Sequence, residues 1–191
     1  MSQNSEKEIQ KLIQEAGFDL GGIAPVTTMT MAADMYEQWL AKGYHGQMEY
    51  LGRNLETRRN LKNKFPWAQS VIVVGLSYYS KWVWDKDWHV SLYSCGDDYH
   101  DIMSDRLRSL AAQIETHFSN HNLESRFYID TGPLLERSYA AMAGLGWIGK
   151  NGNLISREIG SWFFLGEIIT NLELNPQTPP SQNYCGTCDK C

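Results

Sequence analysis

The sequence predicts a layered α/β domain, in which amphipathic helices cover a largely buried β-sheet. Residues 5–17 carry apolar side chains at helical intervals, which indicates an amphipathic opening helix. Val71–Leu76 is an uninterrupted apolar run with the length of a strand, and such runs are typical of central strands covered on both faces. Further helical and strand-like stretches follow along the chain, as is typical of layered α/β proteins.

The composition describes an ordinary globular protein of 191 residues, of which 42% are hydrophobic. The 17 Lys and Arg residues are outnumbered by 22 Asp and Glu residues, and the resulting net charge of -5 gives no general attraction to nucleic acid or to an anionic membrane. No apolar run approaches the length of a membrane span, and the polar first ten residues lack the features of a secretory signal. We therefore expect a cytoplasmic protein that does not bind membranes.

In chain order, the first elements are predicted to be a helix, a strand and a second helix. Ser5 and Glu8 have the spacing of a capping box, and Gly17 is placed to end the first helix. The segment 18–26 contains a double glycine, as expected of a strand that another element approaches closely. A second helix is predicted over residues 31–42. Its buried side chains are expected to be Met35, Trp39 and Leu40.

The middle of the chain is predicted to contain two loops, the buried strand and a long helix. A polar loop spans Tyr44–Asn63 and leads to the strand Val71–Leu76. Residues 81–93 carry tryptophans without periodicity, so we interpret them as a functional loop or an irregular hairpin, whose aromatic rings form a satellite core or stack on a base or cofactor. A helix is expected from Asp101 to about Phe118. Its apolar face consists of Met103, Leu107, Leu110 and Ile114.

The later elements are predicted to be a short strand, a helix and two further strands. The strand Arg126–Asp130 ends at a carboxylate. Pro133 suits the first turn of the following helix, which is expected to stop at Gly144. Further strands are expected at Asn153–Ser156 and Ser161–Thr170.

Asp130 is a candidate catalytic side chain. It follows a strand and precedes the turn Thr131-Gly-Pro133, so its carboxylate would lie at an edge of the sheet, where α/β folds place their sites. Partial burial there would raise its pKa and allow it to deliver a proton near neutral pH. The alternative is that Asp130 caps the following helix.

A glycine-rich segment follows the predicted helix. Gly144, Gly146 and Gly149 have the spacing of a dinucleotide-binding fingerprint, but they do not join a strand to a helix, as that fingerprint requires. We interpret the segment as a floor that lets a large planar ligand approach closely, or as a plain loop.

Three of the four cysteines lie in the last seven positions, as Cys185, Cys188 and Cys191. The spacing C-x2-C-x2-C is the first part of the bacterial ferredoxin run and favours a 4Fe-4S cluster. Zinc, which prefers paired C-x2-C units, and a disulfide, which the cytosol disfavours, are the alternatives. A 4Fe-4S cluster needs a fourth ligand. Cys95 is either that ligand or a buried small residue, and the simpler explanation places the fourth ligand beyond Cys191.

The proline-rich stretch 175–180 predicts an extended linker and a domain boundary. Residues 1–175 then form the α/β domain, and residues 176–191 form the linker and the truncated start of a ferredoxin-type iron–sulfur domain.

Several ordered blocks resemble one enzyme family. The chain is similar, over nearly all of its length, to the N-terminal half of epoxyqueuosine reductases, the cobalamin-dependent iron–sulfur enzymes that complete queuosine in tRNA. The resemblance rests on the cysteine triplet and on six further blocks in order: Met48–Arg53, Pro66–Ala68, Tyr93–His100, Asp130–Arg137, Gly144–Asn151 and Gly160–Glu167.

The resemblance implies a fold, a reaction and a set of cofactors. The fold would be a cobalamin-binding α/β domain like that of reductive dehalogenases, followed by a ferredoxin-like domain with two 4Fe-4S clusters. The reaction would be the reduction of epoxyqueuosine to queuosine at the wobble position of tRNA. A corrinoid-handling module and a reductive dehalogenase relative are the alternatives. A chain that stops at Cys191 would lack the complete electron-transfer path and is expected to be inactive alone.

The resemblance also implies roles for particular residues. Asp130 would be the proton donor above the cobalt, and Cys185, Cys188 and Cys191 would ligate a 4Fe-4S cluster. Glu136 and Arg137 would meet the substrate or nearby RNA, or else be ordinary surface ions. The partners would be tRNA carrying epoxyqueuosine and an external electron donor, with the protein a monomer. The cobalamin-contacting residues would be Arg53, Tyr93, Asp130, Asn153, Leu154 and Ser161.

Overall fold

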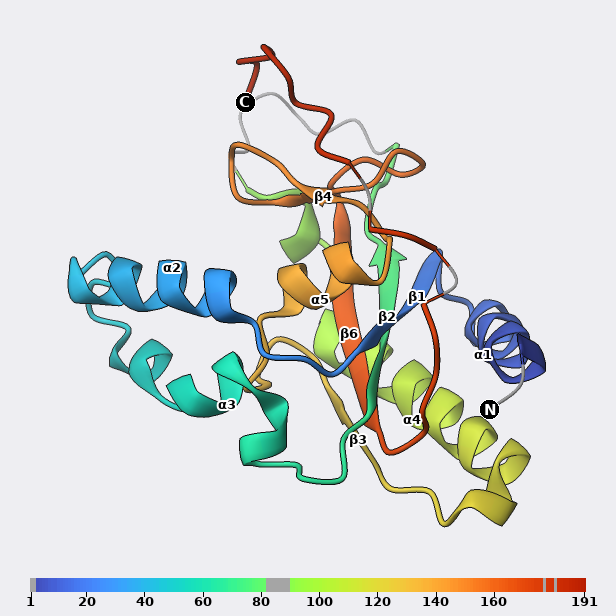
Figure 1. Cartoon of the computed structure of the whole chain (residues 1–191). Helices are drawn as coiled ribbons and strands as arrows, with labels where there is room; N and C mark the ends of the chain where they lie inside the picture. Colours follow the sequence, from blue (N-terminus) through green and yellow to red (C-terminus); the bar gives the residue numbers. More distant parts are fainter. Residues whose placement is uncertain (1–2, 82–89, 177, 181) are drawn as a thin grey trace.

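The structure is a computed structural model that describes residues 3–81, 90–176, 178–180 and 182–191 (Figure 1). The aromatic segment that was expected to form a functional loop or hairpin falls largely on residues 82–89, which lie outside the described residues. Within the described ranges, no helix combines the length and the apolar character that a membrane crossing requires.

A four-stranded sheet forms the centre of the fold, and each neighbouring pair of strands is antiparallel. The prediction of a central strand at 71–76 is confirmed, because Val71, Ile72, Val73 and Val74 are completely buried and their strand has a neighbour on each side. In spatial order the strands are β1 (Leu20–Pro25), β2 (Ser70–Ser77), β6 (Phe163–Thr170) and β3 (Ser125–Tyr128).

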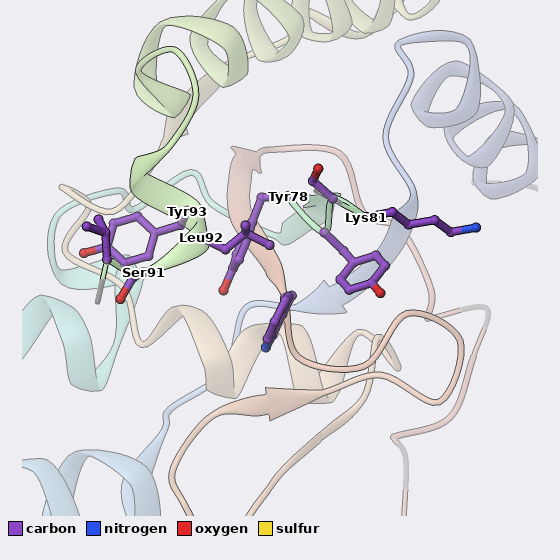
Figure 2. A pocket seen from close by; sticks show the side chains of 9 residues that line it. Tyr78, Lys81, Ser91, Leu92 and Tyr93 are labelled. Carbon is purple, nitrogen blue, oxygen red and sulfur yellow. The ribbon is translucent and has the colours of Figure 1, made fainter. Parts of the chain in front are cut away.

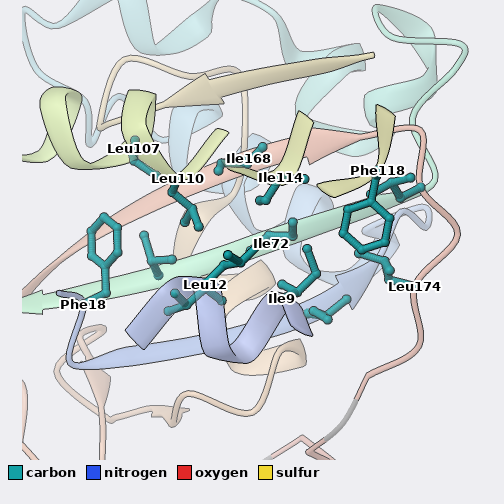
Figure 3. Packing of buried hydrophobic residues seen from close by; sticks show 14 of the residues in the cluster. Ile9, Leu12, Phe18, Ile72, Leu107, Leu110, Ile114, Phe118, Ile168 and Leu174 are labelled. Carbon is teal, nitrogen blue, oxygen red and sulfur yellow. The ribbon is translucent and has the colours of Figure 1, made fainter. Parts of the chain in front are cut away.

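Two helices cover one face of the sheet, α1 (Gln3–Glu15) and α4 (Tyr99–His117). Figure 3 shows their apolar side chains meeting above the strands. All four apolar residues that were predicted to form the inner face of the long helix are buried, since burial of one helical stripe removes its apolar surface from water. The predicted helix over residues 101–118 is therefore confirmed.

The opposite face is covered by α5 (Glu136–Met142) and by the segment that leads into β2. Tyr139 of α5 is completely buried against this face, together with Leu61, Val73 and Ile169. Beside this layer lie α2 (Thr30–Ala41) and α3 (Leu55–Arg59), which pack against each other (Figure 1). The molecule thus has the helix–sheet–helix layers that the sequence predicts.

A second, two-stranded sheet lies beyond the N-terminal end of β6 in Figure 1. It consists of β4 (Trp147–Ile148) and β5 (Leu154–Ile155), so the strand that was predicted at 153–156 is confirmed as part of a small hairpin. Short 3-10 helices complete the described elements, at Glu49–Gly52, Leu61–Asn63, Leu92–Ser94 and Ser119–His121.

The double glycine of β1 is closely approached, as predicted. A Cβ atom on Gly21 would lie 2.6 Å from the Ile13 side chain, and one on Gly22 would lie 2.3 Å from the carbonyl oxygen of Ala143. Because no side chain fits at these distances, the two glycines let α1 and the end of α5 pack directly on the strand.

Four local predictions were wrong. Helix α1 begins at Gln3, so Ser5 lies inside it and is not its cap. Met35 is 66% exposed, because α2 instead buries its Ala33 side, and residues two apart point to nearly opposite sides of a helix. The predicted loop 44–63 contains α3 and two 3-10 helices. Helix α5 begins at Glu136, three residues after Pro133.

Candidate active site

A cavity of about 370 Å³ opens at the end of the main sheet, where β3, α5, the small hairpin and β6 meet. It contains six residues that were predicted to bind cofactor or substrate or to act in catalysis. The lining residues are Tyr99, Asp130, Glu136, Arg137, Asn153, Leu154, Ser161, Phe163, Phe164 and Leu165.

Asp130 lies two residues beyond the end of β3, in a turn that precedes α5. Its main chain has a φ of 57°, in the left-handed region that Asp tolerates better than most residues. The N-cap residue of α5 is Leu135, so the alternative that Asp130 caps this helix is wrong. The turn instead presents an exposed carboxylate to the cavity.

Tyr99 lies beside this carboxylate. Its hydroxyl is 3.5 Å from Asp130 Oδ2, and its ring stacks on Phe164 with the centroids 3.9 Å apart. Burial, reinforced by the negative charge of Asp130, raises the pKa of Tyr99 to about 12. The phenol therefore stays protonated at neutral pH and can act as a hydrogen-bond donor to Asp130.

Glu136 is the second carboxyl group of the cavity. Burial and the charge of Asp130 raise its pKa to about 7, against the opposing charges of Arg58 and Arg137. Glu136 is only partly accessible and its Oε1 atom has no hydrogen-bond partner among the described residues. The interpretation of Glu136 as an ordinary surface ion is therefore wrong, whereas Arg137 is exposed.

Glu167 is a buried acid that sequence reasoning missed. It lies in the middle of β6, is 0% exposed, and neither of its carboxyl oxygens has a partner in the described part of the chain. Burial raises its pKa well above the ordinary value, and the charges of Glu136 and Asp130 act in the same direction. The available signal was a single Glu within an otherwise apolar strand, Phe163–Thr170.

Arg58 was also missed. It lies in α3, donates a hydrogen bond of 2.9 Å to the carbonyl oxygen of Leu134, and lies over the Tyr36 ring. It therefore anchors the turn between β3 and α5. Arg53, which was predicted to contact the cofactor, is exposed and does not line the Asp130 cavity.

Tyr93 was predicted at the same site but lines a neighbouring cavity of about 700 Å³ (Figure 2). The rings of Tyr78 and Trp162 stack nearly parallel in this cavity, at an interplanar angle of 9°. Phe164 connects the two cavities, since it lines the first and lies 4.7 Å from Tyr78 and 6.4 Å from Tyr93, centroid to centroid. The two cavities thus share an aromatic wall.

The glycine-rich segment has a structural explanation. Gly144 has a φ of 82° and follows the end of α5. Cβ atoms on Gly146 and Gly149 would lie 2.2 Å and 2.6 Å from atoms of Ile155, so these glycines permit the β4–β5 hairpin to close. The approaching group is therefore the hairpin itself.

The three C-terminal cysteines lie next to this hairpin. The Trp147 indole N–H donates to Cys185 Sγ at 3.4 Å, and Lys150 Nζ donates to the Cys188 carbonyl oxygen at 2.8 Å. The Trp147 hydrogen bond and Lys150 lower the pKa of Cys185, which favours the thiolate that binds metals. Among the described residues, however, no three His, Cys, Asp or Glu side chains converge into a metal site. Cys95 is exposed, so it is not the buried small residue considered above.

The fold places the chain in a class of α/β domains that includes a reductive dehalogenase domain. A reductive dehalogenase structure, described in connection with B12-dependent dehalogenation, superimposes with a TM-score of 0.56, at 11% identity, over 93% of this chain and 20% of that one. At this identity the likeness concerns the fold alone. The expected resemblance to the dehalogenase domain is confirmed at that level.

More specific similarities lead to epoxyqueuosine reductases. The family model "Epoxyqueuosine reductase QueG, DUF1730" matches residues 58–131. An epoxyqueuosine reductase of Synechocystis sp. is 45% identical over 175 residues, covering 89% of this chain and 59% of that protein. The Streptococcus thermophilus epoxyqueuosine reductase structure has a TM-score of 0.85 at 31% identity, covering 97% of this chain and 50% of that one. The resemblance expected from the sequence is thus confirmed.

Another related structure is described as an epoxyqueuosine reductase with an epoxyqueuosine-modified tRNA-Tyr stem loop. It has a TM-score of 0.82 at 28% identity, and covers 97% of this chain and 50% of that one. The chain spans about six tenths of the length of the curated relatives that it matches and about half of these solved chains.

Proposed function

We propose that this chain is the cofactor-holding and proton-donating part of an epoxyqueuosine reductase, which reduces epoxyqueuosine to queuosine in tRNA. The observation that carries the proposal is the cavity that Asp130 shares with Glu136, Asn153 and Ser161, on a fold that matches epoxyqueuosine reductases over nearly the whole chain. An epoxide oxygen leaves poorly as an alkoxide, so the reaction needs an acid at the point where this oxygen departs.

The residues of the two cavities fit cobalamin. A large planar macrocycle with amide side chains needs apolar faces and a few hydrogen-bonding groups. The shared aromatic wall provides the first, and Asn153 and Ser161 provide the second. Tyr93, Leu154 and Asp130 are further proposed contacts, whereas Arg53 would reach the cofactor only from outside these cavities. When bound, the cofactor would supply the low-potential redox chemistry.

Asp130 is the proposed proton donor. Its exposed carboxyl group faces the cavity, the Tyr99 hydroxyl lies beside it, and the turn that carries it is held by Arg58 through Leu134. Arg137, which donates a hydrogen bond to the Gly152 carbonyl oxygen, is the proposed contact for substrate or nearby RNA. This hydrogen bond joins α5 to the loop that precedes β5.

The cysteine segment is the proposed start of an iron–sulfur domain. Cys185, Cys188 and Cys191 provide a suitable donor set for a 4Fe-4S cluster once a further ligand is available. We place the boundary between the domains near Asn175, because β6 ends at Thr170 and none of the described residues after it form a helix or strand. A second cluster, an external electron donor, a monomeric state and a cytoplasmic location belong to the same proposal.

The proposed partner is tRNA that carries epoxyqueuosine. A related enzyme is described with a stem loop of this kind. The net charge of -5 does not favour binding to a polyanion, so most of the RNA-binding surface is expected outside this chain.

Substitution of Asp130 tests the function directly. In the full-length protein, Asp130→Asn should leave cobalamin uptake unchanged, as seen in the absorbance spectrum, and lower epoxyqueuosine turnover by roughly 100-fold or more. Asp105→Asn, at an exposed position on α4, is the control and should retain normal turnover. A protein that binds cobalamin but shows equal behaviour with and without Asp130 would instead be a corrinoid-handling module. Turnover of a halogenated substrate in place of epoxyqueuosine would indicate a dehalogenase.

A further inference from the structure

Removal of an epoxide oxygen to leave an alkene consumes more protons than one carboxyl group holds. The reaction takes up an electron pair and two protons, both C–O bonds break, and the oxygen leaves as water. Asp130 can deliver one of these protons. The other must come from a second donor or from an Asp130 that is recharged within the same turnover. The following inference rests on the proposed function, since it concerns the source of that proton.

Glu136 is the only other carboxylic acid among the described residues that line the Asp130 cavity. Glu136 is the first residue of α5, and the turn that carries Asp130 precedes this helix. Its Oε1 atom is inaccessible and has no hydrogen-bond partner in the described part of the chain. The main chain of Asp130 hydrogen-bonds to the Glu136 carboxyl group and holds it at the cavity, while its Oε1 atom stays free to exchange a proton.

The two nearby arginines do not neutralise Glu136 by direct pairing. Arg58 donates to the carbonyl oxygen of Leu134, and Arg137 donates to that of Gly152. No ion pair joins either arginine to Glu136 within the described residues, although their charges are close enough to lower its pKa. A tight ion pair with an arginine would lower the pKa of Glu136 further. Without such a pair, Glu136 can retain its proton more easily.

Two further titratable groups are buried near Glu136. Glu167 of β6 is completely buried, interacts electrostatically with Glu136 and has no hydrogen-bond partner among the described residues. Tyr139, one turn after Glu136 on α5, is also buried, and its hydroxyl has no partner in the described ranges. On the cavity side, Asp130 and Tyr99 complete the set of titratable groups that act on Glu136. Burial and the charge of Asp130 therefore favour the protonated form of Glu136, against the charges of Arg58 and Arg137.

We propose that Glu136 is a second catalytic acid, which donates to the departing epoxide oxygen the proton that Asp130 does not supply. The O–H bond of the Glu136 carboxyl group breaks, a new O–H bond forms on the substrate oxygen, and the oxygen leaves as water after both donations. The electron pair comes from the reduced cofactor of the proposed function. Solvent then reprotonates both carboxylates through the open cavity.

The test uses the full-length protein with Glu136→Gln, which retains the shape of the side chain but cannot donate a carboxyl proton. Wild-type turnover should fall as the pH rises through about 7, where Glu136 loses its proton. In Glu136→Gln, turnover should be roughly 10- to 100-fold lower at pH 6, and the fall near pH 7 should disappear. Glu115→Gln, at an exposed position on α4, should match the wild type.

A second readout does not depend on activity. The infrared carbonyl band of a protonated carboxyl group should disappear between pH 6 and pH 8 in the wild type, and this change should be absent from Glu136→Gln. Glu167→Gln separates the two buried acids, because it exchanges one neutral group for another and should retain the pH-dependent fall. If Glu167→Gln abolished the fall instead, the proton would reside on Glu167 and the inference would be overturned.

The outcomes separate the inference from the function on which it rests. An active wild type whose rate and pH profile are unchanged by Glu136→Gln would overturn the inference alone. A wild type that binds cobalamin but does not reduce epoxyqueuosine would overturn the proposed function, and the inference with it.

Discussion

The rings of Tyr99 and Phe164 stack face to face, with centroids 3.9 Å apart and an angle of 7° between their planes. Tyr99 opens α4 and Phe164 belongs to β6, so the stack joins the helical layer to the sheet at the mouth of the candidate site. It also fixes the position of the Tyr99 hydroxyl, 3.5 Å from Asp130 Oδ2.

Tyr99→Phe should therefore separate the effect of the hydroxyl from that of the ring. The stack is retained, so thermal stability should change little. Turnover by the full-length enzyme should fall by roughly 10-fold, because the hydroxyl would no longer help to position the Asp130 carboxyl group. Tyr99→Ala also removes the ring and should lower the free energy of unfolding by about 2 kcal/mol. If Tyr99→Phe lowered stability as much as Tyr99→Ala, the hydroxyl would be structural.

The close packing of β1 against the end of α5 gives a second prediction. A Cβ atom on Gly22 would lie 2.3 Å from the Ala143 carbonyl oxygen, which belongs to the main chain and cannot rotate away. Gly22→Ala should thus lower the free energy of unfolding by about 3 kcal/mol, as measured by denaturant titration. Gly52→Ala is the matched control, because nothing lies within 4 Å of its added Cβ atom, and its effect should stay within about 0.5 kcal/mol.

The fold was predictable where a single periodic pattern determined it. The apolar stripe of α4 and the continuous apolar run of β2 each specify a buried surface without reference to the rest of the chain. Met35 shows where this reasoning fails. Whether an apolar side chain on a short helix is buried depends on which neighbour covers the helix, and α2 is covered on its Ala33 side.

The candidate site was predictable in part from the resemblance. Asp130, Glu136 and Ser161 lie in blocks that the resemblance identified, and the structure brings them to one cavity. The sequence could not show that Arg58, and not Arg53, contacts the site, because both lie in one polar segment. Only the path of α3 brings Arg58 to the β3–α5 turn. Glu167 was missed because the sequence shows only an acid within an apolar strand. Its burial, and its place near Glu136, depend on how the helices pack on the sheet.

The contact between Glu6 and Asn175 gives a third prediction, on the link between α1 and the end of the main domain. Glu6 Oε1 accepts hydrogen bonds from the Asn175 main-chain nitrogen at 3.0 Å and from its amide nitrogen at 3.2 Å. Glu6→Ala removes both hydrogen bonds and should cost about 1–3 kcal/mol in stability. Glu6→Gln retains an acceptor oxygen and should cost less. Equal losses in the two variants would contradict this assignment.

The same contact predicts an acid limb in the stability profile. Burial tends to raise the pKa of Glu6, but the hydrogen bonds from Asn175 and its own main chain outweigh this, and the pKa is lowered below 4.5. A carboxyl group with a lowered folded-state pKa binds fewer protons in the folded state than in the unfolded state. Its contribution is present above pH 4.5 and is lost as the pH falls through the folded-state value. Glu6→Gln should remove this part of the acid sensitivity.

Glu167 gives a fourth prediction, with the opposite sign. Burial raises the pKa of Glu167 far above 4.5, so the folded protein retains a proton that the unfolded chain has lost. The free energy of unfolding should therefore fall as the pH rises above 4.5 toward the folded-state value. Glu167→Met replaces the acid by an apolar side chain of similar size in surroundings that already include Val73 and Ile169.

Because neither carboxyl oxygen has a partner among the described residues, Glu167→Met should be more stable than the wild type by about 1–3 kcal/mol near pH 4.5. The difference should widen toward pH 8, as measured by denaturant titration at each pH. Glu167→Gln retains a polar group and should give a flatter profile with a smaller gain. If Glu167→Met were less stable than the wild type at pH 8, the carboxyl group would have a partner that stabilises the fold. A gain in stability would mean that Glu167 lowers the free energy of unfolding of the wild type, as is common for residues that serve a site.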